Sequence, residues 1–456
     1  MNLEIIILAA GQGTRMKSPL PKVLHPVAGV PMLQHVVNTA RELHPRAIHV
    51  VVGHGAQAVQ DALGREQLNW VIQAEQLGTG HAVLQAMPAV AQDSTVLVLY
   101  GDVPLLSPQT LRALVEQAAS GPALLTARMQ DPTGYGRVLR DERGNVMGVV
   151  EHKDASPDER RVDEINTGVL AAPAADLNHY LPAVGNANSQ GEYYLPDVLA
   201  MAVADGKSVP AQVASTELEI LGVNDRLQLC QVERELQLRR AEQLLRDGVA
   251  IADPARLDIR GTLTCGDGVS IDVNVVMEGD VVLGNGVVIG ANCVLKNVRI
   301  DEGASIHAMS HLEEALVGAG ANVGPYARWR PGTVLAEQAR VGNFVETKKA
   351  RIGVGSKVNH LSYVGDCDMG AGVNVGAGTI TCNYDGVNKH KTELGDGVFI
   401  GSNSTLVAPI QIAASGFVAA GSTLTKAVGS DELAVSRAKQ RNIQGWQRPG
   451  VQDKDD

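Results

Sequence analysis

The C-terminal half of the sequence carries an apolar residue at every sixth position over long stretches. The clearest stretch reads Leu394, Ile400, Leu406, Ile412, Val418 and Leu424, and similar runs begin at Met277, Val317, Ile352 and Met369. A short fixed period indicates a solenoid, in which each repeat buries its apolar residue against the repeats before and after it. Glycine often follows the apolar position, as at Gly284 and Gly318, and it fits sharp corners that a Cβ would obstruct. The pattern predicts a parallel β-prism over residues 262–428.

The N-terminal half follows a different pattern, in which unbroken apolar runs alternate with helical stretches. Strands are expected at residues 3–9, 47–52, 70–73, 95–100, 123–127 and 146–151, and helices at 32–42 and 108–119. Apolar runs without polar alternation predict strands buried on both faces, as in a sheet that helices cover. Ligands of such sheets bind beyond the carboxyl ends of the strands. Residues 1–226 are therefore expected to form an α/β domain with its site at that edge.

A segment of helical period separates the two patterns. Leu229, Val232 and Leu236 recur at three- and four-residue steps with charged residues between them, and Gly248 stands where a helix would end. We expect a connecting helix over residues 227–247 and a second domain over residues 248–456. The tail from Gly445 is polar and has no apolar period, so we expect it to fray.

The six-residue register is interrupted three times, always between residues 341 and 394. The step from Val341 to Ile352 is 11 residues, that from Val364 to Met369 is 5, and that from Val375 to Leu394 is 19. Interruptions let loops leave a rigid scaffold, and such loops often carry function. The same stretch holds a dense set of polar candidates: Glu346, Lys348, His360, Tyr363, Asn374, Asn383 and Tyr384. We therefore expect a functional site in this part of the prism.

Composition narrows the possible partners. A chain of 456 residues is too long for one hydrophobic core, and a net charge of −11 argues against a general nucleic-acid or anionic-membrane binder, which needs a basic face. Five cysteines without a CxxC pair predict reduced thiols, typical of the cytosol. The apolar runs are too short to span a bilayer, and no basic region precedes the first run, so neither a membrane span nor secretion is expected.

A glycine-containing loop follows the first apolar run, in the sequence Leu8-Ala9-Ala10-Gly11-Gln12-Gly13-Thr14-Arg15-Met16. Backbone N–H groups in such a loop can converge on phosphate oxygens, and Arg15 and Lys22 could pair with the same phosphates. The third glycine of the dinucleotide fingerprint and the Gly-Lys-Ser/Thr of a P-loop are absent, so an ordinary strand-to-helix turn remains the alternative. Asp102 follows the apolar run at 95–100, where a carboxylate suits Mg²⁺; the alternative is a turn aspartate bonded to its own backbone.

These segments together resemble the sugar-1-phosphate nucleotidyltransferases. Over its whole length the chain resembles the bacterial bifunctional N-acetylglucosamine-1-phosphate uridyltransferase/glucosamine-1-phosphate acetyltransferases. The resemblance rests on the loop at 8–16 and on Pro21-Lys22, Leu77-Gly78-Thr79-Gly80, Tyr100-Gly101-Asp102, Gly134-Tyr135-Gly136-Arg137, Glu151-His152-Lys153, Asn166-Thr167-Gly168, Gly222-Val223-Asn224, and residues 328–332, 342–346, 360–363 and 376–386.

The resemblance implies a fold and an activity. The fold is α/β, with an N-terminal Rossmann-like nucleotidyltransferase sheet, a connecting helix and a C-terminal left-handed parallel β-helix of hexapeptide repeats. Family members trimerise, with sites between subunits. They transfer acetyl from acetyl-CoA to glucosamine 1-phosphate, and then UMP from UTP to N-acetylglucosamine 1-phosphate, giving UDP-N-acetylglucosamine and pyrophosphate. That product would feed bacterial envelope polysaccharide synthesis in the cytoplasm.

The resemblance also assigns roles to individual residues. For uridylyl transfer it implies nucleotide and sugar contacts from Leu8, Ala9, Ala10, Gly11, Arg15, Lys22, Gln73, Gly78, Thr79, Tyr100, Gly101, Asp102, Gly136, Glu151, Asn166 and Asn224, with Asp102 and Asn224 as ligands of Mg²⁺. For acetyl transfer it implies His360 as the general base, Arg330, Lys348, Tyr363 and Asn374 as contacts of glucosamine 1-phosphate, and Ala377, Asn383, Tyr384, Ser402, Ala420 and Arg437 as contacts of acetyl-CoA. Gln12 departs from the family, in which many members carry lysine.

Three alternatives stay open for the C-terminal half. A lone histidine such as His360 is usually structural, although a neutral imidazole near pH 7 suits the base that acetyl transfer to an amine requires. The prism could be only an oligomerisation scaffold, which the polar cluster argues against. It could also hold a metal through His307, His311, His360 and His390, but these do not recur at multiples of one coil.

Overall fold

The computed structural model describes residues 2–64 and 66–449. The chain divides into two compact units, one ending at Arg240 and the other beginning at Ala241. The boundary falls within helix α7, Arg226–Arg246, which occupies the segment expected to form a connecting helix. Among the described residues, no helix is long and apolar enough to cross a membrane. The part of the tail beyond residue 449, which we expected to fray, lies outside the described residues.

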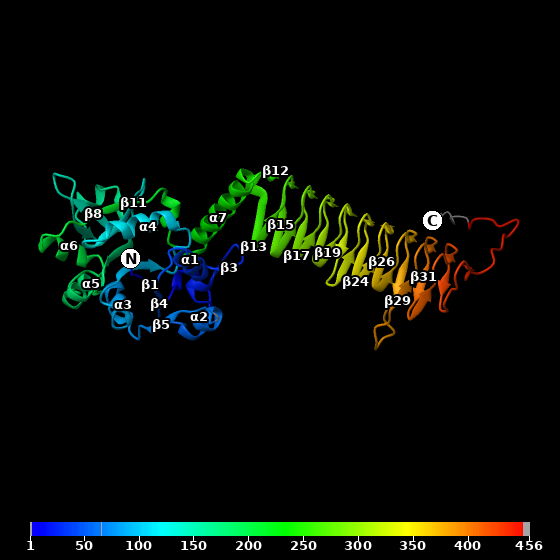
Figure 1. The fold of residues 1–456 in the computed structure, drawn as a ribbon, viewed down its shortest axis with the longest axis horizontal. Coiled ribbons are helices and arrows are strands. Elements are labelled where there is room, and N and C mark those ends of the chain that lie inside the picture. Colours follow the sequence, from blue (N-terminus) through cyan, green and yellow to red (C-terminus); the bar gives the residue numbers. More distant parts are fainter. Residues whose placement is uncertain (1, 65, 450–456) are drawn as a thin grey trace, which may run out of the picture. The chain divides into compact units, whose positions relative to one another are not determined.

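The first unit is built on a mixed nine-stranded sheet with the main order β11-β7-β10-β6-β1-β4-β5 (Figure 1). Its strands are β1 Leu3–Ala9, β4 Ala47–Val52, β5 Asn69–Ile72, β6 Thr95–Tyr100, β7 Ala123–Arg128, β8 Arg137–Arg140, β9 Val146–Val150, β10 Glu164–Pro173 and β11 Ala211–Val213. A separate hairpin pairs β2 Pro26–Val27 with β3 Val30–Pro31. All six predicted strands are confirmed to within one residue at each end.

Helices cover both faces of this sheet. They are α1 Met32–Arg41, α2 Ala56–Leu63, α3 Thr79–Ala86, α4 Pro108–Gln117, α5 Ala174–Tyr180 and α6 Asp197–Ala204, with short 3-10 helices η1 Thr14–Met16, η2 Lys22–Leu24, η3 Met87–Ala89, η4 Glu159–Arg161, η5 Leu181–Ala183, η6 Glu217–Ile220 and, in the second unit, η7 Pro254–Arg256. Successive residues of β1 alternate between two cores, because Ile5 packs with α1, α2 and α4 whereas Ile6 packs with α3, α5 and α6. This double burial explains the unbroken apolar runs.

Strand β10, which the sequence pattern did not predict, lies antiparallel between β6 and β7. Its apolar run is interrupted by Asn166, Thr167 and Gly168, so its hydrophobic pattern does not predict a buried strand. The structure accommodates the interruption with a register shift between Asn166 and Leu170 in the pairing with β7.

The second unit is a column of parallel strands in two ladders (Figure 1). The first ladder contains β12 Ala250–Ile251, β14 Ser270–Ile271, β16 Val288–Ile289, β18 Ser305–Ile306, β20 Asn322–Val323, β23 Arg340–Asn343, β25 Lys357–His360, β27 Asn374–Val375, β30 Phe399–Ile400, β33 Phe417–Val418 and β35 Leu433–Ala434. The second contains β13 Leu257–Cys265, β15 Val275–Leu283, β17 Val294–Ile300, β19 His311–Val317, β21 Arg328–Trp329, β22 Thr333–Leu335, β24 Glu346–Ile352, β26 Tyr363–Met369, β28 Ile380–Cys382, β29 Thr392–Leu394, β31 Thr405–Val407, β32 Ile410–Ile412 and β34 Thr423–Leu424.

Each coil of the column points three larger side chains, and the residue two positions before each of them, into one shared core. In one coil the larger side chains are Ile289, Leu295 and Ile300, and the residues before them are Val287, Cys293 and Val298; all six are almost fully buried, and equivalent residues stack above and below them. A coil spans 18 residues from Ser270 to its partner Val288, and 17 from Val288 to Ser305. Three larger inward residues in each 17 or 18 produce the six-residue period, so the predicted parallel solenoid is confirmed. Its left-handed sense stays a prediction from the resemblance.

Two of the three interruptions in the register do not release loops, and the expectation that they would is wrong. The 11-residue step passes through Thr347, an inward residue of β24 that is fully buried and whose hydroxyl lies 3.0 Å from that of Thr333. The five-residue step is also ordinary, because it recurs between Leu295 and Ile300. The third interruption does release a loop, residues 383–391 between β28 and β29, which projects from the column in Figure 1.

Candidate active sites

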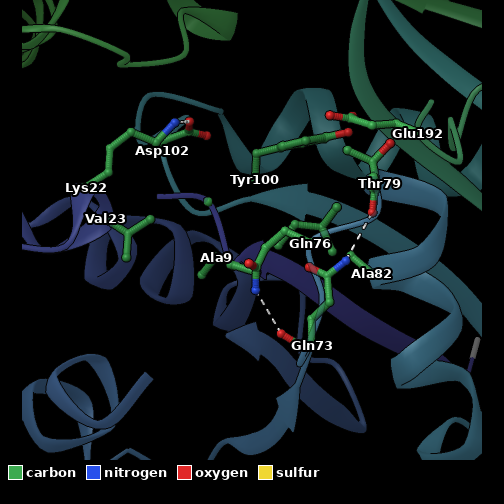
Figure 2. A pocket seen from close by; sticks show the side chains of 14 residues that line it. Ala9, Lys22, Val23, Gln73, Gln76, Thr79, Ala82, Tyr100, Asp102 and Glu192 are labelled. Atoms are coloured by element: carbon green, nitrogen blue, oxygen red, sulfur yellow. Dashed lines mark hydrogen bonds and ion pairs between the residues drawn. The ribbon is translucent and has the colours of Figure 1, made fainter. Parts of the chain in front are cut away.

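A hollow of about 220 Å³ lies beyond the carboxyl ends of the parallel strands β1, β5 and β6. It is lined by Leu8, Ala9, Ala10, Gly11, Lys22, Val23, Gln73, Gln76, Gly78, Thr79, Ala82, Tyr100, Asp102 and Glu192 (Figure 2). The strands end at Ala9, Ile72 and Tyr100, so the residues that follow them meet at one edge of the sheet. The structure therefore brings together ten of the sixteen residues expected to contact nucleotide and sugar.

One cation and two oxygen ligands converge at this hollow. The Lys22 ammonium forms an ion pair with Asp102, and both side chains are largely buried. The same Nζ donates to Asn224 Oδ1 at 3.3 Å. Asn224 comes from the segment before α7, where its own N–H donates to Gln228 Oε1 at 2.7 Å. Three segments far apart in the sequence thus place a carboxylate and an amide oxygen against one positive charge.

This donor set fits a magnesium ion. The oxygens of Asp102 and Asn224 already share one cation, and Mg²⁺ is typically held by one or two protein oxygens together with substrate phosphates and water. Within residues 2–64 and 66–449, no group of three or more His, Cys, Asp or Glu side chains is arranged to hold a metal. With two protein oxygens at this place, a divalent ion would complete its coordination with nucleotide phosphates and water.

A second group of expected contacts surrounds Tyr100. The Tyr100 ring packs directly against Gly168, where a Cβ would come within 2.7 Å of the ring. Asn166 fixes this approach, because its Oδ1 accepts the Gly168 N–H at 2.8 Å and its own N–H donates to the Gly136 carbonyl at 2.8 Å. Gly136 in turn lies against the Glu151 carboxylate, 3.0 Å from the place of a Cβ. The glycines thus allow β10 and the neighbouring hairpin to approach Tyr100 and Glu151.

Burial shifts the acidity of both side chains. Burial raises the pKa of Glu151, and the carboxylates of Asp154 and Asp197 raise that pKa further. Burial, followed by the charge of Asp102, raises the pKa of the Tyr100 phenol well above its ordinary value. Tyr100 therefore stays protonated across the physiological range and can donate to a sugar or phosphate oxygen.

Six of the sixteen expected contacts lie outside the lining. Gly136, Glu151, Asn166 and Asn224 are described above, and the other two are Gly101 and Arg15. Gly101 supports the floor of the hollow, where its N–H donates to the Leu8 carbonyl at 2.9 Å. Arg15 lies exposed on η1. Four residues of the lining were not predicted from the sequence as ligand contacts: Val23, Gln76, Ala82 and Glu192. Ala82 could have been found from its helical spacing after Thr79, whereas Glu192 arrives on a loop whose next residue bonds to Leu77 and Gly80, which no local pattern indicates.

His360 lies outside the column at the end of β25, with its side chain exposed. The strand register places five residues in the same corner of successive coils: Asn343, His360, Ala377, Ser402 and Ala420, here called the corner row. Backbone hydrogen bonds tie each corner to the next, from Gly378 N–H to the His360 carbonyl at 3.3 Å and from Asn403 N–H to the Ala377 carbonyl at 2.7 Å. The row is therefore held on a rigid backbone.

The contact of His360 with Asn343 sets its tautomer. His360 Nδ1 lies 2.9 Å from Asn343 Oδ1. Because that oxygen can only accept, Nδ1 carries a proton, and in the neutral imidazole the lone pair is then on Nε2. The imidazole is thus exposed to solvent on its Nε2 side, not packed inside the column as a structural histidine would be.

The expected acceptor contacts lie on the two ladders. Arg330 and Lys348 occupy the same position in successive coils of the second ladder, and Arg330 also pairs with Glu346 at 3.3 Å. Tyr363 begins β26, three residues after His360, and its hydroxyl accepts from Asn383 Nδ2 at 3.4 Å. Asn374 lies on the first ladder, beside Lys357 and Phe399.

The projecting loop contacts Tyr363 through Asn383. The C-terminal arm, which is the segment that follows β35, contacts the corner row through Arg437. In the loop, Lys389 Nζ lies 3.9 Å from the Tyr384 ring centroid. Backbone N–H groups, chiefly that of Asn388, and then His390 hold the pKa of Asp385 well below its usual range. In the arm, the Arg437 guanidinium donates to the Ala420 carbonyl at 2.6 Å, which brings it to the end of the corner row.

Known proteins resemble the chain in both units. Residues 5–158 match the family described as MobA-like NTP transferase domain, and residues 259–352 match the GMPPB C-terminal domain. A protein of Marinobacter nauticus described as "Bifunctional protein GlmU" is 57% identical over 448 residues, covering 98% of this chain and 99% of its own. Proteins with the same description from Pseudomonas putida strain GB-1 and Alkalilimnicola ehrlichii are 56% and 57% identical, covering 98% of this chain and 99% and 97% of theirs.

Proposed function

The chain belongs to the GlmU family of bifunctional proteins, and on this premise we propose that its two units carry two successive transferase activities. The second unit acetylates glucosamine 1-phosphate with acetyl-CoA. The first unit joins the resulting N-acetylglucosamine 1-phosphate to UMP from UTP, giving UDP-N-acetylglucosamine and pyrophosphate. The observation that carries the proposal is an exposed imidazole on the column, held through Nδ1 by Asn343, in the same chain as a hollow that gathers Lys22, Asp102 and Asn224.

Uridylyl transfer needs no protein nucleophile. A phosphate oxygen of N-acetylglucosamine 1-phosphate attacks the α-phosphorus of UTP in line, one P–O bond forms, and the bond to the pyrophosphate breaks. Positioning and charge neutralisation carry such a reaction. Lys22 supplies one positive charge, and Asp102 and Asn224 would hold Mg²⁺, which neutralises phosphate charge when bound. Tyr100, Glu151 and the Asn166 backbone segment border the side proposed for the sugar.

Acetyl transfer relies on His360. The amine of glucosamine 1-phosphate attacks the thioester carbonyl of acetyl-CoA, a C–N bond forms, the C–S bond breaks, and His360 Nε2 accepts the amine proton. Asn343 keeps Nδ1 protonated, so Nε2 is available for that proton. Arg330 and Lys348, placed one coil apart, are proposed to bind the phosphate of the acceptor.

The corner row suits the extended pantetheine chain of acetyl-CoA. Beyond His360 the row carries only small side chains, Ala377, Ser402 and Ala420, which leave the backbone accessible to an extended ligand. Arg437 lies at the end of the row, where its positive charge could meet phosphates of the coenzyme. Asn383 and Tyr384, in the projecting loop, complete the set proposed for acetyl-CoA.

We also propose a homotrimer located in the cytosol. An apolar strip lies beside the corner row on four successive coils, formed by Met309, Tyr326, Phe344 and Leu361, which are 46%, 49%, 54% and 63% exposed. The Tyr326 and Phe344 rings stack with their centroids 5.1 Å apart. A contiguous exposed strip of this kind is typical of a surface that another subunit covers. The five free cysteines support a reducing compartment.

One reconstitution tests both activities. The purified chain is given glucosamine 1-phosphate, acetyl-CoA, UTP and Mg²⁺, and UDP-N-acetylglucosamine is measured. Omitting acetyl-CoA should stop its formation, and adding N-acetylglucosamine 1-phosphate should restore it. If product forms only after that addition, the column is a scaffold and the acetyl half of the proposal is wrong. Light scattering of the same sample should give the mass of three chains.

A further inference from the structure

Gln73 presents a fixed amide to the hollow. The residue is only 3% exposed, and it lines the hollow directly after β5. Its Nε2 donates to the Gly78 carbonyl at 3.2 Å and lies 3.1 Å from His81 Nδ1 on α3. Figure 2 shows the amide nitrogen turned toward Thr79 and the amide oxygen on the opposite side. The amide nitrogen therefore has two neighbours on one wall, the Gly78 carbonyl and His81 Nδ1.

The two partners together determine which end of the amide faces that wall. The Gly78 carbonyl can only accept, so it requires the amide nitrogen. His81 adds the same requirement when Nδ1 carries its lone pair, which places the ring proton on Nε2. The nitrogen of the exposed Gln85 amide, Nε2, lies 3.2 Å from His81 Nε2. With this ring tautomer the Gln85 amide turns by a half-turn, so that its oxygen accepts the His81 Nε2 proton.

We infer that His81 is a positioning residue that sets the pyrimidine selectivity of the uridylyl site through Gln73. This inference rests on the proposed function of the first unit. With Nε2 held on the wall by Gly78 and His81, Gln73 offers only its Oε1 acceptor to a base in the hollow. Uracil has an N–H donor at ring position 3, whereas cytosine has an acceptor there. The fixed oxygen therefore favours UTP and repels CTP.

His81 can be replaced without rebuilding the fold. It is half-buried, and its other side borders a second hollow of about 340 Å³ lined by Leu84 and Leu181. His81→Leu removes the acceptor at Nδ1. His81→Asn keeps an acceptor, because asparagine Oδ1 branches from the same carbon as histidine Nδ1. His179→Leu is the matched control, since His179 lies on α5 and its side chain is 72% exposed.

The experiment compares UTP with CTP in full-length variants. N-acetylglucosamine 1-phosphate is supplied directly, and kcat/KM for each nucleotide is measured together with KM for the sugar phosphate. His81→Leu should lower the UTP/CTP ratio of kcat/KM by roughly 2- to 12-fold, as expected for the loss of one neutral hydrogen bond. KM for the sugar phosphate should stay unchanged. His81→Asn should recover most of the ratio, and His179→Leu should keep all of it.

The opposite outcomes are equally clear. If His81→Leu lowers kcat/KM for UTP and CTP in parallel, or leaves the ratio at its wild-type value, His81 has no positioning role. An equal loss of selectivity in His81→Asn and His81→Leu also overturns the inference, because the retained acceptor would then be irrelevant. If the wild-type chain makes no UDP-N-acetylglucosamine at all, the proposed function of the first unit is wrong, and the inference about His81 is wrong with it.

Discussion

Replacing Gly168 by alanine tests whether the position of Tyr100 controls uridylyl transfer. Gly168 has φ +83°, and a Cβ there would lie 2.7 Å from Tyr100 Cε2 and from its hydroxyl oxygen. Non-bonded carbon atoms rest about 3.5 Å apart or more, so the ring or β10 must move by roughly 0.8 Å. The Asn166 Oδ1 bond to the Gly168 N–H limits how far β10 can yield, so the ring is expected to move.

The cost of this substitution has two parts. A left-handed backbone conformation costs an alanine roughly 1–2 kcal/mol, and overpacking against a buried neighbour costs about 1–3 kcal/mol more. We therefore expect the free energy of unfolding of the first unit to fall by about 2–5 kcal/mol. A shift of several tenths of an ångström in a substrate-positioning ring should also lower the rate of pyrophosphate release by about 10- to 100-fold.

The assay separates these effects by comparing two glycines and two reactions. Gly206→Ala has a similar backbone penalty, with φ +78°, but nothing lies within 4 Å of its Cβ. It should lose stability without losing pyrophosphate release. Both variants should release CoA thiol from acetyl-CoA at the wild-type rate, because that site belongs to the other unit. If Gly168→Ala releases pyrophosphate at the wild-type rate and is only as destabilised as Gly206→Ala, the proposed role of the Tyr100 position is refuted.

Three further changes address the remaining groups. Asp102→Asn should lower pyrophosphate release by about 10² at every Mg²⁺ concentration without affecting thiol release, and a wild-type rate would contradict the proposed ligand role. His360→Ala should lose thiol release and keep pyrophosphate release; loss of both would indicate a structural histidine. Backbone N–H groups, chiefly that of Asn388, and then His390 keep the pKa of Asp385 in the folded protein below the usual value of about 4. The Asp385 carboxylate therefore stabilises the 383–391 loop fully above about pH 4, and this stabilisation is lost as pH falls through the lowered pKa. Hydrogen exchange of this loop should therefore rise only in stronger acid, and in Asp385→Asn it should already be high at neutral pH; equal exchange in both proteins would exclude this role.

The sequence predicted the secondary-structure elements that are determined by the residue pattern of their own segment. The strands at 3–9 and 95–100 are continuous apolar runs, and their burial on both faces requires no knowledge of distant residues. β10 was missed because its polar residues serve Tyr100 and the neighbouring hairpin, so its composition reflects contacts that only the fold creates. Thr347 was not predicted as an inward residue for a similar reason. It occupies a position at which the period requires an apolar residue, and its buried hydroxyl is satisfied by the hydroxyl of Thr333 in the neighbouring coil.

The candidate sites divide in the same way. Motifs next to strand ends, such as Asp102 after β6, indicated the edge at which ligands bind. The position of Glu192 and the bond between His81 and Gln73 could not be anticipated, because both depend on segments that meet only in the tertiary structure. The pairing of His360 with Asn343, 17 residues earlier, depends on the coil length, which becomes known only when the five-residue steps are assigned.

Strand pairing in the column joins each coil only to its immediate neighbours, so its coils can be lost one at a time from the free end. Within residues 2–64 and 66–449, β35 pairs only with β33, and Arg437 follows it, whereas His360 lies on β25 with paired strands on both sides. Mild heat or denaturant should consequently open the last coils while the imidazole and its asparagine partner stay ordered. Cosubstrate affinity would then decline before the capacity for proton transfer, giving an enzyme that weakens gradually instead of failing in one cooperative step.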